Sequence, residues 1–151
     1  MALNQAIRLD SHIINLSLSG PEDPLLRQLI EKALEKGIIV IAAVPGKNQI
    51  GGFPANIQGA IAVGVGGEAN DTEIIAPGQD ILTTVPHQAY DFMTGSSFAT
   101  PHVAGVAALL MQLHPDWQAA DVKQQLRSDS NSLTAQTLNA ATTIAKQDEQ
   151  H

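Results

Sequence analysis

The sequence contains no cysteine, which excludes a disulfide framework and any metal site built from thiolates. Aromatic residues make up only 3% of the 151 residues, so small aliphatic side chains must do most of the core packing. Hydrophobic residues nevertheless account for 44% of the chain, which is enough for one domain with a real core.

Long apolar runs and basic clusters are also missing. No stretch approaches the roughly 20 apolar residues needed to span a bilayer, and the first residues lack the basic and apolar regions of a signal peptide. We therefore expect neither a membrane span nor a signal peptide, and the cellular location stays open. The formal net charge of −7, without any basic run, argues against nucleic acid or an anionic membrane as a partner.

The first half of the chain predicts a strand–helix–strand unit. Apolar, β-branched residues predict strands at 13–18 and 38–43. Between them, Asp23 is typical of a helix N-cap, Pro24 of a first helical residue, and Gly37 of a helix stop. Two strands joined by a helix over about 30 residues are expected to be parallel.

The centre of the chain is a turn of small residues that runs directly into an apolar helix. Gly95, Ser96 and Ser97 precede an apolar segment to Leu110, which predicts a buried helix with Pro101 in its first turns. A serine here fits two interpretations. It is an ordinary helix cap, or it is a nucleophile beside unpaired N–H groups at the positive end of the helix dipole.

A longer stretch of sequence favours the second interpretation. Residues 95–105 read Gly-Ser-Ser-Phe-Ala-Thr-Pro-His-Val-Ala-Gly. This closely resembles the nucleophile motif of the subtilisin-like serine proteases (subtilases, peptidase family S8), with Ser96 in place of the usual threonine. The resemblance implies that Ser97 is the catalytic nucleophile and that His102 is the family's helical histidine, which is not the catalytic base.

Other segments resemble the same family. Residues 14–21, Ile-Asn-Leu-Ser-Leu-Ser-Gly-Pro, are similar to a subtilase strand whose edge pairs with an extended peptide. The resemblance implies that Ser17, Leu18 and Ser19 bind a peptide or protein substrate, with Ser19 replacing a glycine.

The oxyanion-hole residue is ambiguous. The strand ending at Ala43 resembles the one that leads to the family's Ala-Ala-Ala-Gly-Asn, whose asparagine completes the oxyanion hole. Without a gap Gly46 takes that position, and with a two-residue shift Asn48 takes it. Loss of such a donor typically costs about 2.7–4 kcal/mol in the transition state.

Two parts of the subtilase triad have no match. The motifs Asp-Ser/Thr-Gly and His-Gly-Thr-His-Val-Ala-Gly precede, in the family, the strand that begins here at Ile13, and Asp10 is followed by Ser-His. The resemblance therefore implies the C-terminal half of a subtilase catalytic domain, a fragment or subunit of a serine endopeptidase that is inactive alone. The alternative is a non-catalytic module that binds peptides or assembles with other proteins.

The expected fold is α/β, a three-layer α/β/α domain with a mostly parallel, subtilisin-like sheet that lacks the N-terminal part. We expect residues 1–145 to form this partial domain and residues 146–151 a disordered tail. A partner supplying the N-terminal half, or self-association, would cover the exposed edges and faces. No cofactor follows from these residues; calcium is common in the family, but no calcium or other metal site can be placed.

Overall fold

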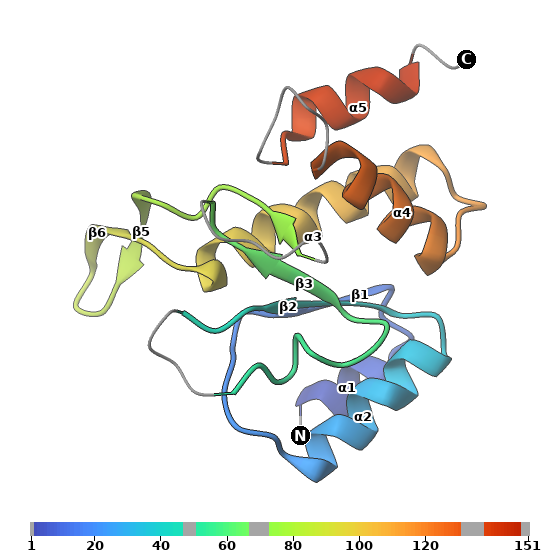
Figure 1. The fold of residues 1–151 in the computed structure, drawn as a ribbon, viewed down its shortest axis with the longest axis horizontal. Coiled ribbons are helices and arrows are strands. Elements are labelled where there is room, and N and C mark those ends of the chain that lie inside the picture. The colour runs from blue at the N-terminus through green and yellow to red at the C-terminus, as the bar shows by residue number, and fades with distance from the viewer. Residues whose placement is uncertain (1, 47–50, 67–72, 131–137, 149–151) are drawn as a thin grey trace.

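A computed structural model describes residues 2–46, 51–66, 73–130 and 138–148. Helices lie on both sides of a central sheet, and a separate hairpin projects from one end (Figure 1). In chain order the elements are α1 (Ala2–Arg8), β1 (Ile13–Leu16), α2 (Pro24–Glu35), β2 (Ile39–Ala43), β3 (Ile61–Gly64), β4 (Ile74–Ile75), β5 (Ile81–Val85), β6 (Ala89–Met93), α3 (Ser96–Leu113), α4 (Ala119–Ser130) and α5 (Ala140–Asp148).

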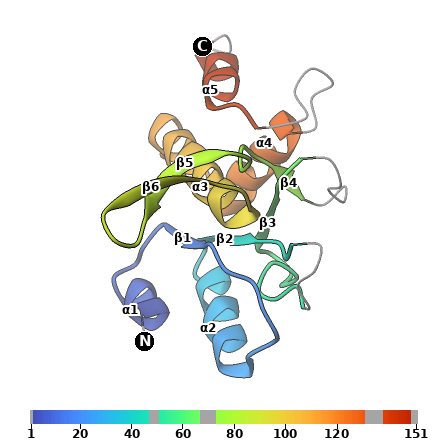
Figure 2. The ribbon, with the colours of Figure 1, turned by 90° about the vertical axis from the view of Figure 1, so that its left-hand side faces the viewer.

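The central sheet has four parallel strands in the order β1-β2-β3-β4. The predicted strand–helix–strand unit is confirmed as β1, α2 and β2, with Ile13 opposite Ile39 and Leu16 opposite Ala42. Because the strands are parallel, their carboxyl ends all lie at one end of the sheet, which we call its carboxyl end. Figure 2 looks onto this carboxyl end, where α3 begins and the hairpin crosses in front of it.

Helix α2 begins as the sequence predicts. The side chain of Asp23 accepts a hydrogen bond of 2.8 Å from the backbone N–H of Leu26, and Pro24 is the first helical residue. The helix ends before Gly37, whose φ of +78° is readily adopted only by glycine. These local signals fix the length of the helix and therefore where β2 starts.

The core forms on both faces of the sheet, which confirms the α/β fold in three layers. Successive residues of β2 point to opposite faces, so Ile39 and Ile41 pack toward α3 while Ile38 and Val40, from β2 and the residue before it, pack toward α2. All five residues of β2 are buried, as expected for a central strand covered on both sides.

The two edges of the sheet differ. At β4, the backbone N–H of Ile75 donates to Ser130 Oγ at 3.2 Å, and the carbonyl of Ile75 accepts from the N–H of Leu138 at 2.6 Å. The C-terminal segments therefore close this edge. At the other edge, β1 pairs with β2 on its inner side and has no strand on its outer side within the described residues.

Two features differ from the sequence-based expectations. Helix α3 is not buried all round: its sheet-facing side is buried, but Leu109 and Leu113 are each 43% exposed. Residues 89–93 form a strand, β6, that the sequence did not predict.

Candidate active site

The start of α3 places two adjacent serines in different environments. Gly95 is the N-cap residue, and no side chain caps the helix, so neither Ser96 nor Ser97 acts as the N-cap. Ser96 Oγ donates a 2.6 Å hydrogen bond to the carbonyl of Val44, immediately after β2. The Ser97 hydroxyl has no hydrogen-bond partner among the described residues, and Ser97 is only partly buried. The first serine thus anchors the turn and the second remains available for chemistry.

The turn before these serines is fastened to the preceding loop. The backbone N–H of Gly95 donates to the carbonyl of Gly78 at 2.8 Å, and the N–H of Asp80 donates to Thr94 Oγ1 at 3.0 Å. Gly78 lies so close to its neighbours that it has no room for a side chain, since a Cβ there would lie 2.5 Å from a methyl group of Val65. Backbone contacts therefore hold the serines in place from two directions.

The expected substrate-binding residues lie at the carboxyl end of the sheet. Leu16 is level with Ala42 across the β1–β2 ladder, so the residues that follow β1 lie level with Ala43 and Val44. Neighbouring strands are about 4.8 Å apart. The structure therefore brings Ser17, Leu18 and Ser19 to the same end of the sheet as the Val44 carbonyl that anchors the Ser96 hydroxyl. Ser17 and Leu18 are exposed, and Ser19 is partly buried.

A second loop supports this segment. The N–H of Gly20 donates to the carbonyl of Phe53 at 2.9 Å. Gly51 passes so close that a Cβ on it would collide with the Gly20 carbonyl, and its φ of +113° also favours glycine. The segment that leaves β1 is thereby held against the loop around Phe53.

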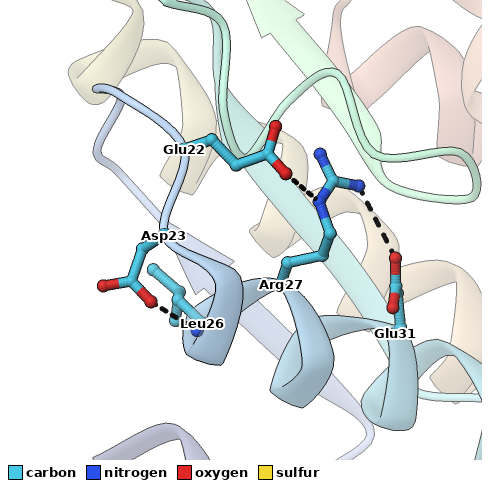
Figure 3. A network of polar contacts seen from close by, with 5 residues as sticks. All are labelled: Glu22, Asp23, Leu26, Arg27 and Glu31. Carbon is cyan, nitrogen blue, oxygen red and sulfur yellow. Dashed lines mark hydrogen bonds and ion pairs between the residues drawn. The ribbon is translucent and has the colours of Figure 1, made fainter.

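A network of ion pairs lies at the start of α2 (Figure 3). Arg27 contacts Glu22 at 2.6 Å and Glu31 at 3.5 Å, and its guanidinium lies 5.7 Å from the centroid of the Phe53 ring. The hydrogen bond from Arg27 lowers the pKa of Glu22 and raises that of Arg27. Arg27 therefore links the start of α2 to the loop around Phe53; nothing in the sequence pattern indicated this link.

The structure describes one of the two candidates for the oxyanion hole. Gly46 is an exposed residue shortly after β2, and it has no side chain with which to donate. Asn48 lies outside the described residues. At the helix itself, the N–H groups of Phe98 and Ala99 donate to the carbonyl of Gly95, which leaves those of Ser96 and Ser97 to face an oxyanion.

The described histidines lie away from Ser97 or are otherwise engaged. His102 Nδ1 donates to the Phe98 carbonyl at 2.9 Å. His114 follows α3 about 25 Å from Ser97 by helical rise, and stacks on Trp117. His12 precedes β1 and therefore lies at the amino end of the sheet, opposite the carboxyl end. His87 lies in the turn of the β5–β6 hairpin.

Within residues 2–46, 51–66, 73–130 and 138–148, no group of three or more acidic or histidine side chains is arranged to hold a metal ion. None of the described helices has the length and apolar character to cross a membrane.

Comparison with known proteins identifies a family for most of the chain. The sequence model of the Subtilase family matches residues 1–143. The chain is 37% identical to Subtilisin from Bacillus pumilus over 144 residues, covering 85% of this chain and 52% of that protein. It is 36% identical to Subtilisin E from Bacillus subtilis (strain 168), covering 85% of this chain and 38% of that protein.

A solved protease structure is similar to this chain along most of its length. The prenylagaramide maturation protease PagA superposes with a TM-score of 0.75 at 29% identity, covering 95% of this chain and 65% of that one. This chain thus spans about half or less of the length of the two subtilisins and about two thirds of the PagA chain.

Proposed function

Because this chain belongs to the subtilase family, we propose that it carries the nucleophile, Ser97, and part of the substrate cleft of a serine endopeptidase. The observation that carries the proposal is the unengaged Ser97 hydroxyl at the start of α3, beside a serine that is anchored to the end of β2. In the proposed reaction Ser97 Oγ gives its proton to a base and attacks the peptide carbonyl, and the helix N–H groups stabilise the oxyanion. The C–N bond then breaks, and the amine leaves with the proton from the base. Water hydrolyses the acyl ester, which releases the acid and restores the Ser97 hydroxyl.

The base and the orienting acid are proposed to come from polypeptide outside these 151 residues. The placement of His12, His87, His102 and His114 supports this, since each lies away from Ser97 or is bonded elsewhere. The greater length of the relatives also supports it. A serine without a base is a weak nucleophile at neutral pH, so the chain alone is expected to be inactive.

The substrate is proposed to be an extended peptide or protein segment that lies along Ser17, Leu18 and Ser19. For the oxyanion, Asn48 is the side-chain candidate and Gly46 the alternative. We expect Asn48→Ala to slow acylation of Ser97 by about 10²–10³-fold if Asn48 is the donor. Single-turnover kinetics of the completed enzyme measure this rate, and an unchanged rate would assign the role to backbone groups instead.

A second candidate function is a non-catalytic module that binds peptides or assembles with another chain. No strand lies on the outer side of β1 in the part of the chain that the structure describes, and this favours the second candidate, because an unpaired strand edge is a template for strand addition. The two functions differ in whether the Ser97 hydroxyl ever reacts.

A fluorophosphonate probe, which labels activated serines, distinguishes the two candidate functions. We expect little labelling of the chain alone. Strong labelling is expected after addition of a polypeptide that contains the motifs Asp-Ser-Gly and His-Gly-Thr-His-Val-Ala-Gly, and Ser97→Ala should abolish it. Rapid labelling of the isolated chain would contradict the missing base, and no labelling in the assembled complex would support the non-catalytic module.

A further inference from the structure

A cavity of about 240 Å³ opens at the amino end of the central sheet, between α2 and α4. It is lined by Ile39 and Val40 at the start of β2 and by Ile61 at the start of β3, and all three are buried. Leu34 of α2 and Ala120 of α4 complete its walls. Figure 1 shows these two helices on opposite sides of the sheet, so the cavity lies across the end of the sheet where the layers meet.

One charged side chain, Lys123, lines this cavity among the described residues. Its Nζ donates hydrogen bonds to the carbonyls of Gly59 at 3.0 Å and Ala60 at 3.2 Å. An ammonium group has three N–H donors, so these two bonds leave one donor free. In the described part of the chain no carboxylate pairs with Lys123. Burial lowers the pKa of Lys123, and the charge of Arg127 lowers it further, so an anion placed beside this ammonium would stabilise its charged form.

The size and lining of the cavity define the rest of the ligand. A cavity of about 150 Å³ with apolar walls holds a benzene molecule. In proportion, a cavity of about 240 Å³ has room for about eight to ten carbon atoms. The other lining residues are aliphatic or glycine, so polar atoms on the body of a ligand would lose their hydrogen bonds to water there. The complementary ligand is therefore a hydrocarbon chain that ends in one anionic group.

We propose that this cavity binds a medium-chain monocarboxylate of about eight carbon atoms, whose carboxylate accepts a hydrogen bond from Lys123 and whose chain lies against Ile39 and Ile61. The site is separate from the candidate active site. Val44 follows β2 at the carboxyl end of the sheet, and five residues of strand place it about 17 Å from Ile39. Binding here requires neither a catalytic base nor Ser97, so the proposal does not depend on the proposed function.

Isothermal titration calorimetry of the full chain tests this with octanoate, 1-octanol and octylamine. These probes share one hydrocarbon chain and differ in the charge of the head group. We expect octanoate to bind at one site per chain and 1-octanol to bind about tenfold more weakly, because a neutral hydroxyl makes the weaker hydrogen bond to an ammonium. Octylamine should not bind, because its cation would face that of Lys123.

Two substitutions locate the site. Lys123→Met removes the ammonium and keeps an apolar side chain, so it should weaken octanoate binding about tenfold and leave 1-octanol binding unchanged, whereas Lys123→Arg should retain octanoate binding. Because the methionine variant also loses the bonds to Gly59 and Ala60, a second change leaves those bonds in place. Ala120→Leu fills the cavity and should abolish binding of both ligands. Its matched control is Ala141→Leu, the same change at an exposed alanine of α5, which should bind as the wild type does.

Three results would overturn the proposal. Equal affinities for octanoate and 1-octanol would show that Lys123 plays no part in recognition. Unchanged octanoate binding by Ala120→Leu would place the ligand elsewhere on the molecule. Absence of binding by every probe would leave Lys123 only the structural task of holding the carbonyls that precede β3.

Discussion

The adjacent serines at the start of α3 should respond in opposite ways to the same small substitution. Ser96→Ala removes the 2.6 Å hydrogen bond to the Val44 carbonyl, whereas Ser97→Ala removes a hydroxyl that has no partner among the described residues. We therefore expect Ser96→Ala to lower the free energy of unfolding and Ser97→Ala to leave it nearly unchanged. Reactivity toward a fluorophosphonate in the completed enzyme should be lost entirely only with Ser97→Ala.

The magnitude follows from the bond that is lost. A neutral hydrogen bond contributes about 0.5–1.5 kcal/mol, and the partly buried carbonyl of Val44 loses this donor as well. We expect Ser96→Ala to destabilise the chain by about 1–2 kcal/mol. For a chain of this size that corresponds to a fall of about 2–8 °C in Tm. The effect of Ser97→Ala should stay within about 0.5 kcal/mol.

Urea denaturation measures both variants, with Trp117 as the reporter. It is the single tryptophan, it packs against the core on the α3 side, and its ring stacks on His114 with centroids 4.0 Å apart. Unfolding should therefore change its fluorescence. Ser96→Thr serves as the control, because threonine keeps the hydroxyl and should retain most of the stability.

One pattern of results would refute the reasoning. If Ser97→Ala were the more destabilising substitution, the Ser97 hydroxyl would be a structural group. If Ser96→Ala also matched the wild type in stability, the bond to Val44 would contribute nothing to the fold. The assignment of anchor and nucleophile to these two residues would then be reversed.

Three further predictions concern the supports of the site. Gly78→Ala places a methyl group 2.9 Å from the Gly95 carbonyl, so it should cost about 1–3 kcal/mol in urea denaturation and slow Ser97 labelling. Asp23→Ala removes the cap of α2 and should cost about 1 kcal/mol, measured by thermal unfolding. Arg27 lowers the pKa of Glu22, so this carboxylate contributes stability that is lost as the pH falls below about 4.5 through its folded-state pKa; Glu22→Gln should flatten that acid limb in a pH series of urea titrations.

The strand–helix–strand unit was predictable because each of its signals is local. Asp23 and Pro24 start α2, Gly37 ends it, and the uninterrupted apolar run of β2 requires cover on both faces. Such features depend on neighbouring residues alone. The family and the α/β fold were also accessible from sequence, because the motif around Ser97 extends over eleven positions.

The hairpin was not predictable in the same way. Hairpin loops are usually marked by glycine, asparagine or aspartate, because these residues readily adopt positive φ. Here three residues join Val85 to Ala89, and the positive φ values of 67° and 58° belong to His87 and Gln88, which give no such signal. The anchoring of Ser96 on Val44 joins residues 52 positions apart, and no sequence period indicates a contact of that kind.

The unequal edges of the central sheet set a rule for assembly. Ser130 and Leu138 occupy the hydrogen-bonding groups of Ile75, so a strand from another molecule cannot add at β4 without displacing them. Addition through this sheet is therefore directed to β1. As far as the described residues go, the sheet is open on the β1 side alone. A unit with one open side can form a closed pair or accept a single partner, but it cannot propagate a fibre through its sheet, because a fibre needs two open sides.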